Sequence, residues 1–344
     1  MKLKGSDIIA EVLIEQGVDT IFGYPGGAVL NIYDALYKYR DKIHHILTAH
    51  EQGASHAADG YARATGKTGV VIATSGPGAT NLVTGIATAY MDSIPMVAIT
   101  GNVGTSYIGK DAFQEVYITG ITMPITKHNF FVSDIKELAP TLREAFKIAN
   151  SGRKGPVLVD IPKDVTAAIT EYEKAAPEVI IDNTVINEDE VKKAAALINK
   201  AKRPVIEIGG GVVSSEASDL VRMLVNKTGA PCCHTLMAAG VLGYSEKLNY
   251  GLVGMHGSFV TNKAIDEADV LVAIGTRFSD RVALNTNRFA HKAKVIQIDI
   301  DLSEIDKNVK VDHALVGDVK TIVMDLLHYV KQSDRTDWLK TLDE

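Results

Sequence analysis

Glu51 is the acidic residue whose position in the sequence suits it best for chemistry. It follows an apolar run at residues 43–47, which is typical of a buried strand, and it opens an Ala-rich stretch with good helix propensity. Open α/β sheets bind their ligands where strands pass into helices. A carboxylate in the first turn of a helix is also favoured by the helix dipole, by about 0.3–1 kcal/mol, so Glu51 alone does not establish a site.

A second strand-to-helix turn follows one βα unit later. Residues 73–81 read Ala-Thr-Ser-Gly-Pro-Gly-Ala-Thr-Asn, and their glycines let a ligand approach the backbone closely. Earlier in the chain, residues 23–27 read Gly-Tyr-Pro-Gly-Gly, which indicates a sharp bend. Two strand-to-helix turns in tandem, at 51 and at 73–81, predict a binding site.

Alternating apolar runs and amphipathic segments must position these turns. In the first half, helices are predicted at 6–16, 29–39, 51–65, 78–91 and 134–150, and strands at 20–22, 43–47, 69–74, 96–100 and 157–162. In the second half, a helix is predicted at 187–201, capped by Asn187 with Glu190, and strands at 204–208, 232–235, 270–274 and 294–300. This alternation predicts an α/β protein with two doubly wound parallel-sheet domains. Their expected bounds are 1–165 and 187–332, with linkers at 166–186 and 333–344.

Composition narrows the range of functions that the protein could have. The 36 basic and 42 acidic residues give a net charge of −6 with no basic block, which argues against nucleic acid as a partner. We expect a cytoplasmic protein without membrane association, because no apolar stretch could span a bilayer and the first residues show no signal-peptide pattern. The adjacent Cys232 and Cys233 cannot form an ordinary loop-closing disulfide and lack metal-site spacing, so we expect buried strand residues.

Three features of the sequence have two interpretations each. The triple glycine at 209–211 follows a predicted strand and could cradle a dinucleotide, or it could form a tight loop. Arg277 and Arg281 could face phosphates, or they could be a solvated pair on one helical face. His50 and His56 flank Glu51, but histidines near strand ends are usually structural, and neither is assigned a role.

Four motifs of the first half together resemble the pyrimidine-binding domain of thiamine-diphosphate enzymes. They are residues 23–27, His50-Glu51-Gln52-Gly53, residues 73–81 and Asp111-Ala112-Phe113-Gln114-Glu115. More narrowly, the chain resembles the acetolactate (acetohydroxyacid) synthase family along nearly its whole length. The motifs that carry this likeness are Ser151-Gly152-Arg153, residues 157–164, Thr235-Leu236-Met237, Gly254-Met255-His256-Gly257, residues 275–281 and residues 298–301.

The resemblance implies a catalytic role for Glu51. Thiamine chemistry requires loss of a proton from C2 of the thiazolium ring, and the base is the cofactor's own 4′-imino group, formed when a carboxylic acid bonds to ring N1′. A carboxyl group shielded from water suits that task. The residues assigned by resemblance to thiamine diphosphate are Pro25, Gly26, Glu51, Pro77, Asn81 and Gln114, and those bordering the substrate entrance are Gly27, Ala28, Phe113, Gln114 and Lys163.

The resemblance also implies FAD in the second, Rossmann-like domain. Glycines would admit the dinucleotide, arginines would face its phosphates and carboxylates would accept from ribose hydroxyls. The contacts assigned in this way are Arg153, Gly209, Gly210, Gly211, Thr235, Leu236, Met237, Gly254, Met255, His256, Gly275, Arg277, Asp280, Arg281, Asp299, Ile300, Asp318 and Val319.

The implied transferase reaction decarboxylates pyruvate and joins the two-carbon unit to a second 2-ketoacid, pyruvate or 2-ketobutyrate, in isoleucine and valine biosynthesis. The resemblance implies a homodimer or higher homo-oligomer and a small regulatory subunit. A product assay would distinguish sister enzymes such as pyruvate oxidase or a 2-ketoacid decarboxylase. A non-catalytic FAD-binding or assembly module is the alternative from another class.

The sequence departs from the family pattern at three places. The Gly-Asp-Gly motif that holds Mg²⁺ and the cofactor diphosphate in the family does not occur, and the nearest approach is Gly317-Asp318-Val319. We therefore expect residues 1–344 to form two domains without the magnesium site, and to be inactive alone. Many family members have Gln-Val-Pro where this chain has Asn102-Val103-Gly104, and Asp where it has Ser279.

Overall fold

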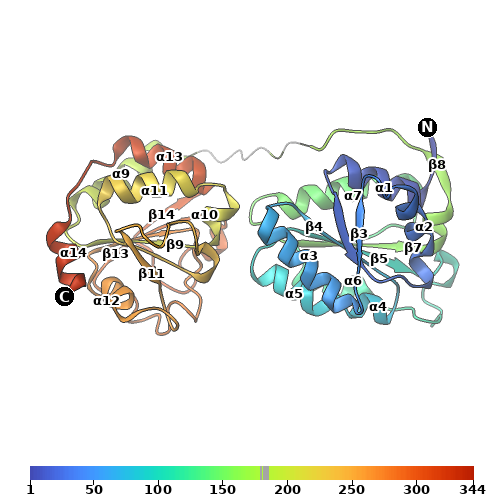
Figure 1. Cartoon of the computed structure of the whole chain (residues 1–344), viewed down its shortest axis with the longest axis horizontal. Coiled ribbons are helices and arrows are strands. Elements are labelled where there is room, and N and C mark those ends of the chain that lie inside the picture. Colours follow the sequence, from blue (N-terminus) through green and yellow to red (C-terminus); the bar gives the residue numbers. More distant parts are fainter. Residues whose placement is uncertain (179, 181–185) are drawn as a thin grey trace. The chain divides into compact units, whose positions relative to one another are not determined.

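The computed structural model of the chain describes residues 1–178, 180 and 186–344 (Figure 1). The chain divides into two compact units, Met1–Ile181 and Asp182–Glu344. Each unit contains a six-stranded sheet in which all neighbouring strands are parallel, with helices on both faces. The predicted fold class, two doubly wound α/β domains, is confirmed.

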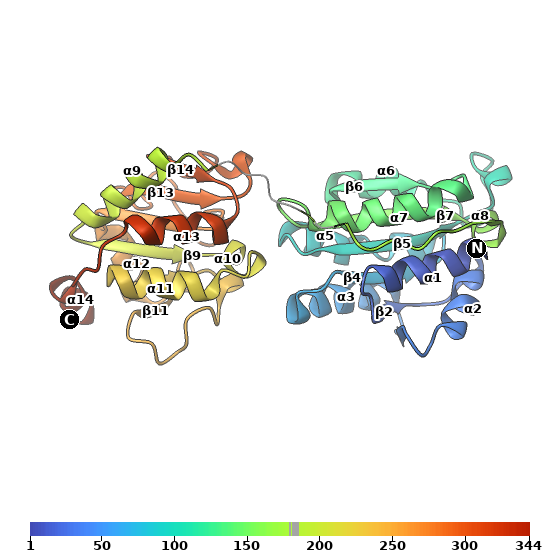
Figure 2. The same ribbon diagram turned by 90° about the horizontal axis from the view of Figure 1, so that it is seen from above.

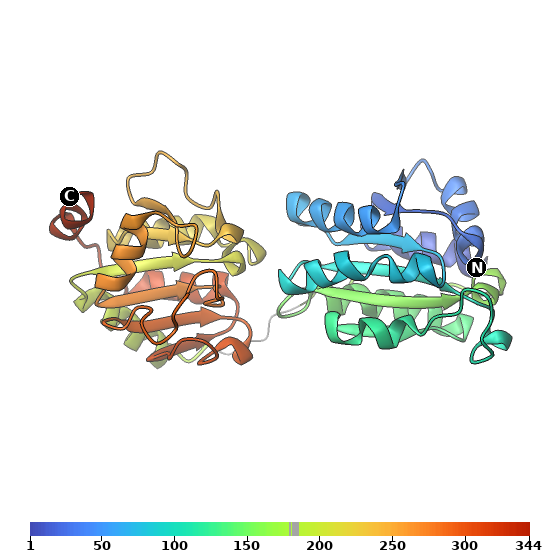
Figure 3. The same ribbon diagram turned by 90° about the horizontal axis from the view of Figure 1, so that it is seen from below.

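The sheet of the first unit is buried at its centre, where β4, β5 and β7 expose no residue on either face. Helices α1, α2 and α7 pack on one face, and α3 and α5 cover the other (Figures 2 and 3). The strand order is β3 (His44–Leu47), β2 (Thr20–Gly23), β4 (Gly69–Ala73), β5 (Met96–Asn102), β7 (Pro156–Pro162), β6 (His128–Phe131). The helices are α1 (Gly5–Glu15), α2 (Leu30–Lys38), α3 (Glu51–Thr65), α4 (Pro77–Thr80), α5 (Val83–Met91), α6 (Ile118–Thr122), α7 (Ile135–Asn150) and α8 (Lys163–Ala167).

Three sequence-based expectations for this unit need correction. Strand β3 is not buried, because it forms the edge of the sheet and exposes most of its side chains. The helix expected at 78–91 is two helices, α4 and α5, separated at Asn81. The expected linker at 166–186 contains the end of α8 and strand β8 (Ile169–Glu171), which pairs antiparallel with β1 (Lys2–Lys4). Its positions 179 and 181–185 lie outside the described residues.

In the sheet of the second unit, successive strands along the chain are added first on one side of β9 and then on its other side. Helices α9 (Glu188–Lys200), α11 (Ser218–Thr228) and α13 (Val319–Tyr329) pack on one face, and α12 (Phe259–Glu267) and α14 (Thr336–Asp343) belong to the core on the other (Figure 2). The strand order is β11 (Asn249–Leu252), β10 (Cys232–His234), β9 (Pro204–Ile208), β12 (Val270–Ile274), β13 (Lys294–Asp299), β14 (His313–Val316). Counted from β9, this is 3-2-1-4-5-6, the order typical of dinucleotide-binding sheets.

The polar tail at 333–344, where a linker was expected, contains helix α14. Trp338 and Leu342 lie on one face of α14 and are buried in the core of the second unit, and the Trp338 indole N–H donates to the Pro204 carbonyl oxygen at 3.2 Å. Two apolar residues four apart suffice to dock a short helix, although the segment is polar on average.

Two smaller expectations can be compared directly. Both cysteines are free and buried on β10, as expected. Within the described part of the chain, no helix is long and apolar enough to cross a membrane.

We expect Glu15 to be a principal stabilising residue of the first unit. Its carboxylate is buried and accepts hydrogen bonds from Arg143 Nε at 3.0 Å, from the Ala175 amide at 2.8 Å and from the Tyr172 hydroxyl, which tie α1 to α7 and to the irregular segment that follows β8. Glu15→Ala should lower the free energy of unfolding by about 3 kcal/mol, because buried donors lose their acceptor.

Urea denaturation of Glu15→Ala and of a control variant would measure their free energies of unfolding. Glu144→Ala is the matched control, since Glu144 is an exposed acid on α7 whose ion pair with Lys147 is long, 3.8 Å. Equal stabilities of the Glu15 and Glu144 variants would contradict the prediction.

Candidate functional site

Three turns of the first unit meet at one edge of its sheet. Strands β3, β2 and β4 are neighbours, and Gly23 of β2 stands opposite Leu47 of β3 and Ile72 of β4. The three strands therefore end at the same level, and the segments that follow them, residues 24–27, 48–50 and 74–76, lie side by side. Strand β3 lies on one side of β2, whereas β4 and the later strands lie on the other, so the strand order reverses between β2 and β4. Ligands of open α/β sheets bind at such a reversal of strand order.

Glu51 is the first residue of α3 and lies at this edge. Its N-terminal neighbour, His50, caps the helix, because its Nδ1 accepts from the Gln52 amide at 3.1 Å. The Glu51 side chain is nearly buried, with 8% of the residue exposed. Asn81 Nδ2 donates to Glu51 Oε2 at 3.0 Å, whereas Oε1 accepts no hydrogen bond from any of the described residues. One carboxylate oxygen is thus fixed and the other is available.

Thr74 and Tyr33 lie beside Glu51, but neither was individually predicted from the sequence to belong to the site. Thr74 Oγ1 accepts from the Ala28 amide at 3.2 Å, and its side chain lies where a Cβ on Gly26 or Gly78 would stand. Tyr33 lies on α2, and burial, with a smaller contribution from the charge of Glu51, raises the pKa of its phenol. Thr74 is part of the motif at 73–81 and could have been noticed there. Tyr33 has no sequence signal, because only tertiary packing brings α2 to this edge.

Gln114 reaches the same edge through a close backbone contact. Gly76 has φ +62°, and a Cβ there would lie 2.7 Å from the Gln114 carbonyl oxygen, so only glycine fits. Gln114 itself has φ +59°, which is uncommon for a residue with a side chain. Its neighbour Glu115 holds the loop, because its carboxylate accepts from the Ala112 amide at 2.9 Å and from the Gly109 amide. Phe113, at the loop tip, is 88% exposed.

Lys163 follows β7 at the same edge, since Pro162 stands opposite Asn102, the last residue of β5. Beneath it, Asp160 accepts from Thr100 Oγ1 at 2.7 Å and from Asn102 Nδ2 at 2.6 Å. Burial raises the pKa of Asp160 to about 6, although these hydrogen bonds lower it. Asn102, at one of the departures from the family pattern, is therefore part of a buried hydrogen-bonded group.

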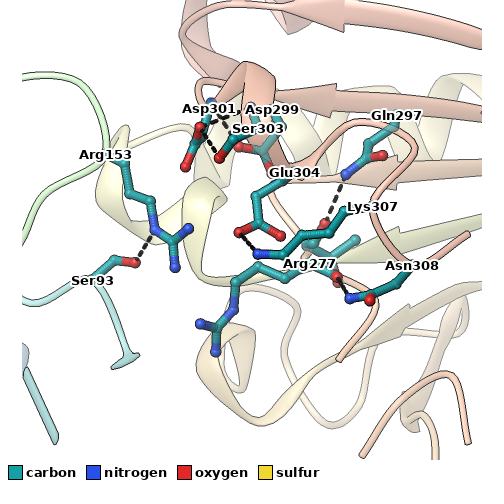
Figure 4. A network of polar contacts seen from close by, with 11 residues as sticks. Ser93, Arg153, Arg277, Gln297, Asp299, Asp301, Ser303, Glu304, Lys307 and Asn308 are labelled. Atoms are coloured by element: carbon teal, nitrogen blue, oxygen red, sulfur yellow. Dashed lines mark hydrogen bonds and ion pairs between the residues drawn. The ribbon is translucent and has the colours of Figure 1, made fainter. Parts of the chain in front are cut away.

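The first unit brings together all the residues assigned to thiamine diphosphate and to the substrate entrance, but not Arg153. Arg153 precedes β7 and donates from Nε to Ser93 Oγ at 2.8 Å (Figure 4). Ser93 precedes β5, so Arg153 lies at the edge of the sheet opposite to Glu51.

The other residues assigned to FAD collect at the carboxyl ends of the six strands of the second unit. The turns after β9 and β12 are in direct contact: the Gly211 amide donates to the Gly275 carbonyl oxygen at 3.1 Å, and a Cβ on Gly209 would lie 2.2 Å from that oxygen. These glycines therefore let two turns pack tightly, whether or not a ligand is bound. The edge carries Gly209–Gly211 after β9, Thr235–Met237 after β10, Gly254–His256 after β11, Gly275–Arg281 after β12, Asp299 and Ile300 at the end of β13 and Asp318 after β14.

The interpretation of Arg277 and Arg281 as a pair on one helical face is wrong, because residues 275–281 form a loop. The carbonyl oxygen of Arg277 accepts from Asn308 Nδ2 at 3.2 Å, which holds the turn (Figure 4). The Arg281 guanidinium contacts Met255 Sδ at 3.7 Å and Asp280 at 3.7 Å. Both arginines stand at the edge formed by the carboxyl ends of the second sheet's strands.

The carboxylates at this edge also have structural partners. Asp299 Oδ1 accepts from the Asp301 amide at 2.9 Å, and Asp318 Oδ1 caps α13 by accepting from the Thr321 amide at 3.1 Å. Val319, the first residue of α13, is buried in the core, so only its backbone could face a ligand.

Comparison with known proteins identifies the two units. A family model described as "Thiamine pyrophosphate enzyme, N-terminal TPP binding domain" matches residues 3–121, and one described as "Thiamine pyrophosphate enzyme, central domain" matches residues 191–326. The chain belongs to the thiamine pyrophosphate enzymes. The resemblance inferred from the motifs is therefore confirmed at the level of the family.

Curated relatives of the chain carry the name acetolactate synthase. The chain is 50% identical over 351 residues to the probable acetolactate synthase large subunit of Methanocaldococcus jannaschii, and 49% identical over 352 residues to the acetolactate synthase of Mycobacterium leprae. It is 44% identical over 349 residues to the acetolactate synthase large subunit of Buchnera aphidicola subsp. Acyrthosiphon pisum. Each alignment covers 99% of the chain, but only 59%, 56% and 61% of these relatives.

The edge that carries Glu51 fits the pyrimidine ring of thiamine pyrophosphate. The ring presents a nitrogen that pairs with a carboxyl group, and Glu51 offers a nearly buried carboxylate with one available oxygen. Because residues 26 and 78 are glycines, no side chain at these positions collides with Thr74 or Glu51. By contrast, no group of three or more His, Cys, Asp or Glu side chains placed to hold a metal ion occurs among the described residues.

Proposed function

We propose that residues 1–344 supply the pyrimidine-binding and FAD-binding parts of an acetolactate synthase large subunit. The enzyme would decarboxylate pyruvate and join the two-carbon unit to pyruvate or 2-ketobutyrate. The observation that carries the proposal is the Glu51 carboxylate, which is fixed through Oε2 by Asn81 and available at Oε1, at the reversal point of the first sheet. The names of the relatives support acetolactate synthesis over the pyruvate oxidase or decarboxylase reactions.

Glu51 would hold and return a proton at Oε1, opposite the pyrimidine N1′. When bound, thiamine diphosphate supplies the carbon centre that attacks the 2-ketoacid. Asn81 keeps the carboxylate oriented, and the nearly complete burial of Glu51 keeps water from competing for its proton. The backbone around Gly76 and Gln114 would close one side of the ring site, and Pro25, Gly26 and Pro77 another. Gly27, Ala28, Phe113 and Lys163 would border the substrate.

FAD would bind at the reversal point of the second sheet, between β9 and β12. The 3-2-1-4-5-6 strand order supports a dinucleotide there. Arg277 and Arg281 would face its diphosphate. Mg²⁺ would be held with the cofactor diphosphate by residues outside those described.

The assembly would be at least a homodimer in the cytoplasm. Several relatives are named large subunits, which supports association with a small regulatory subunit.

Titration with FAD tests the second half of the proposal. The purified chain should retain flavin on gel filtration and quench its fluorescence. Gly209→Ala should abolish retention, because its Cβ would collide with the Gly275 carbonyl oxygen at 2.2 Å. Gly53→Ala is the control, since a Cβ there would meet no heavy atom within 4 Å apart from its chain neighbours and the backbone of its own helix. No retained flavin in the parent chain at high FAD excess would contradict the proposal.

A further inference from the structure

A polar group lies inside the core of the second unit, directly beneath the turn that follows β12. Glu207 on β9 and Gln297 on β13 are both fully buried. The strand registers place each of them opposite Ala273 of β12, so the three residues form one row across the sheet and their side chains emerge on the same face. The small Ala273 side chain leaves room for the two longer side chains to extend above it.

Both side chains bind Thr276. The Thr276 hydroxyl donates to Glu207 Oε1 at 2.8 Å, and Gln297 Nε2 donates to the Thr276 carbonyl oxygen at 3.3 Å (Figure 4 shows Gln297). Glu207 Oε2 and Gln297 Oε1 are also buried, and neither accepts a hydrogen bond from a described residue. Both atoms belong to side chains that bind Thr276, and a proton on Glu207 would supply a donor that this buried group lacks.

The surroundings of Glu207 favour that proton. Burial raises the pKa of Glu207 to about 7, and the Thr276 hydrogen bond lowers it only in part. Among the described residues, the Cys232 and Cys233 thiols on β10 interact with the charge of Glu207, and burial keeps these thiols protonated because it raises their pKa values. The packed face is otherwise apolar, with Phe278, Val282 and Ala283 in the same cluster as Cys233 and Ala273.

We propose that Glu207, as a neutral carboxylic acid, is a positioning residue for dinucleotide binding: together with Gln297 it fixes Thr276 and thereby the turn at 275–277. The proposal rests on the FAD site proposed above. Thr276 is the middle residue of a turn that also contains Gly275, which packs on the turn after β9, and Arg277, which would face phosphate. A charged Glu207 would repel Gln297 Oε1 and displace Thr276, and both turns would shift together because they are in direct contact.

Two substitutions separate this role from a merely structural one. Glu207→Gln preserves the shape and the acceptor for Thr276, and its amide can donate to Gln297 Oε1 at every pH. Glu207→Leu removes both the hydrogen bond with Thr276 and the proposed hydrogen bond with Gln297. Glu216→Gln is the matched control, because Glu216 is an exposed acid in the same unit, just after α10 (Gly210–Ser214).

The readout is the Kd for FAD as a function of pH, together with the melting temperature of the FAD-free chain. With a pKa near 7, the Kd of the parent should rise roughly tenfold from pH 6 to pH 8. Glu207→Gln should bind at pH 8 as the parent does at pH 6, Glu207→Leu should bind weakly at both pH values, and the control should follow the parent. The FAD-free Gln variant should melt above the parent at pH 8 and close to it at pH 5, because the raised pKa makes the parent lose stability as pH rises from about 4.5 to 7.

The outcomes distinguish this inference from the FAD proposal. A parent chain that binds FAD with the same pH dependence as Glu207→Gln overturns the positioning role, even when the variant is more stable. A parent chain that binds no FAD at any pH overturns the FAD site itself and this inference with it. If Glu207→Leu does not fold, Glu207→Gln alone still decides the question.

Discussion

In a complete large subunit that contains this segment, Glu51→Gln is expected to lower the turnover number for acetolactate formation by roughly 10³-fold. Gln has the same shape as Glu and can keep the contact with Asn81, so the fold should survive. What it cannot do is take a proton from the pyrimidine ring nitrogen and return it in each cycle. The affinity for thiamine diphosphate should therefore fall much less than kcat.

Steady-state kinetics of the purified variant, with cofactor titrations, would measure both quantities. Glu137→Gln is the matched control, because Glu137 is an exposed acid in the first turn of α7, just as Glu51 lies in the first turn of α3. A Glu51→Gln enzyme that kept more than about a tenth of the parent kcat, a loss below 1.4 kcal/mol, would show that Glu51 is not the acid that activates the cofactor.

The position of Glu51 could be predicted from the sequence because strand, turn and helix signals are local. The structure begins α3 at Glu51, as predicted. The edge position of β3 could not be predicted, since an apolar run looks the same in a central strand and in an edge strand. Tyr33 beside Glu51 was missed for a related reason, because its contact depends on how α2 packs and not on any spacing in the chain.

In the second unit, the sequence showed the glycine turns but not what they touch. The triple glycine at 209–211 had two interpretations, a dinucleotide cradle or a tight loop, and the structure shows that Gly209 and Gly211 pack closely against Gly275 of another turn. Strand order decides which turns are neighbours, and it depends on long-range pairing. Glu207 was likewise included in an apolar strand and given no role, and only the register of β9, β12 and β13 shows that it shares a face with Gln297.

Residues 1–344 by themselves are expected to form no acetolactate from pyruvate, even with thiamine diphosphate, Mg²⁺ and FAD supplied. The edge around Glu51 offers partners for the pyrimidine ring only. A diphosphate is clamped through a hard cation with oxygen ligands, and the described residues contain no group of three or more acidic, His or Cys side chains placed to hold a metal. The ring end alone should bind weakly, because its few contacts must offset the entropy lost on association.

Acetolactate formation by the purified chain at saturating cofactors is the deciding measurement, with a complete large subunit assayed in parallel as the positive control. Carboligation needs both ends of the cofactor held together, since misplacing the reacting carbon by about 1 Å costs on the order of 10²-fold in rate. Adding, as a separate polypeptide, the part of a relative that residues 1–344 do not match should give activity only if it presents the diphosphate next to Glu51. Turnover by residues 1–344 above the protein-free control would mean that these residues hold a diphosphate site of their own.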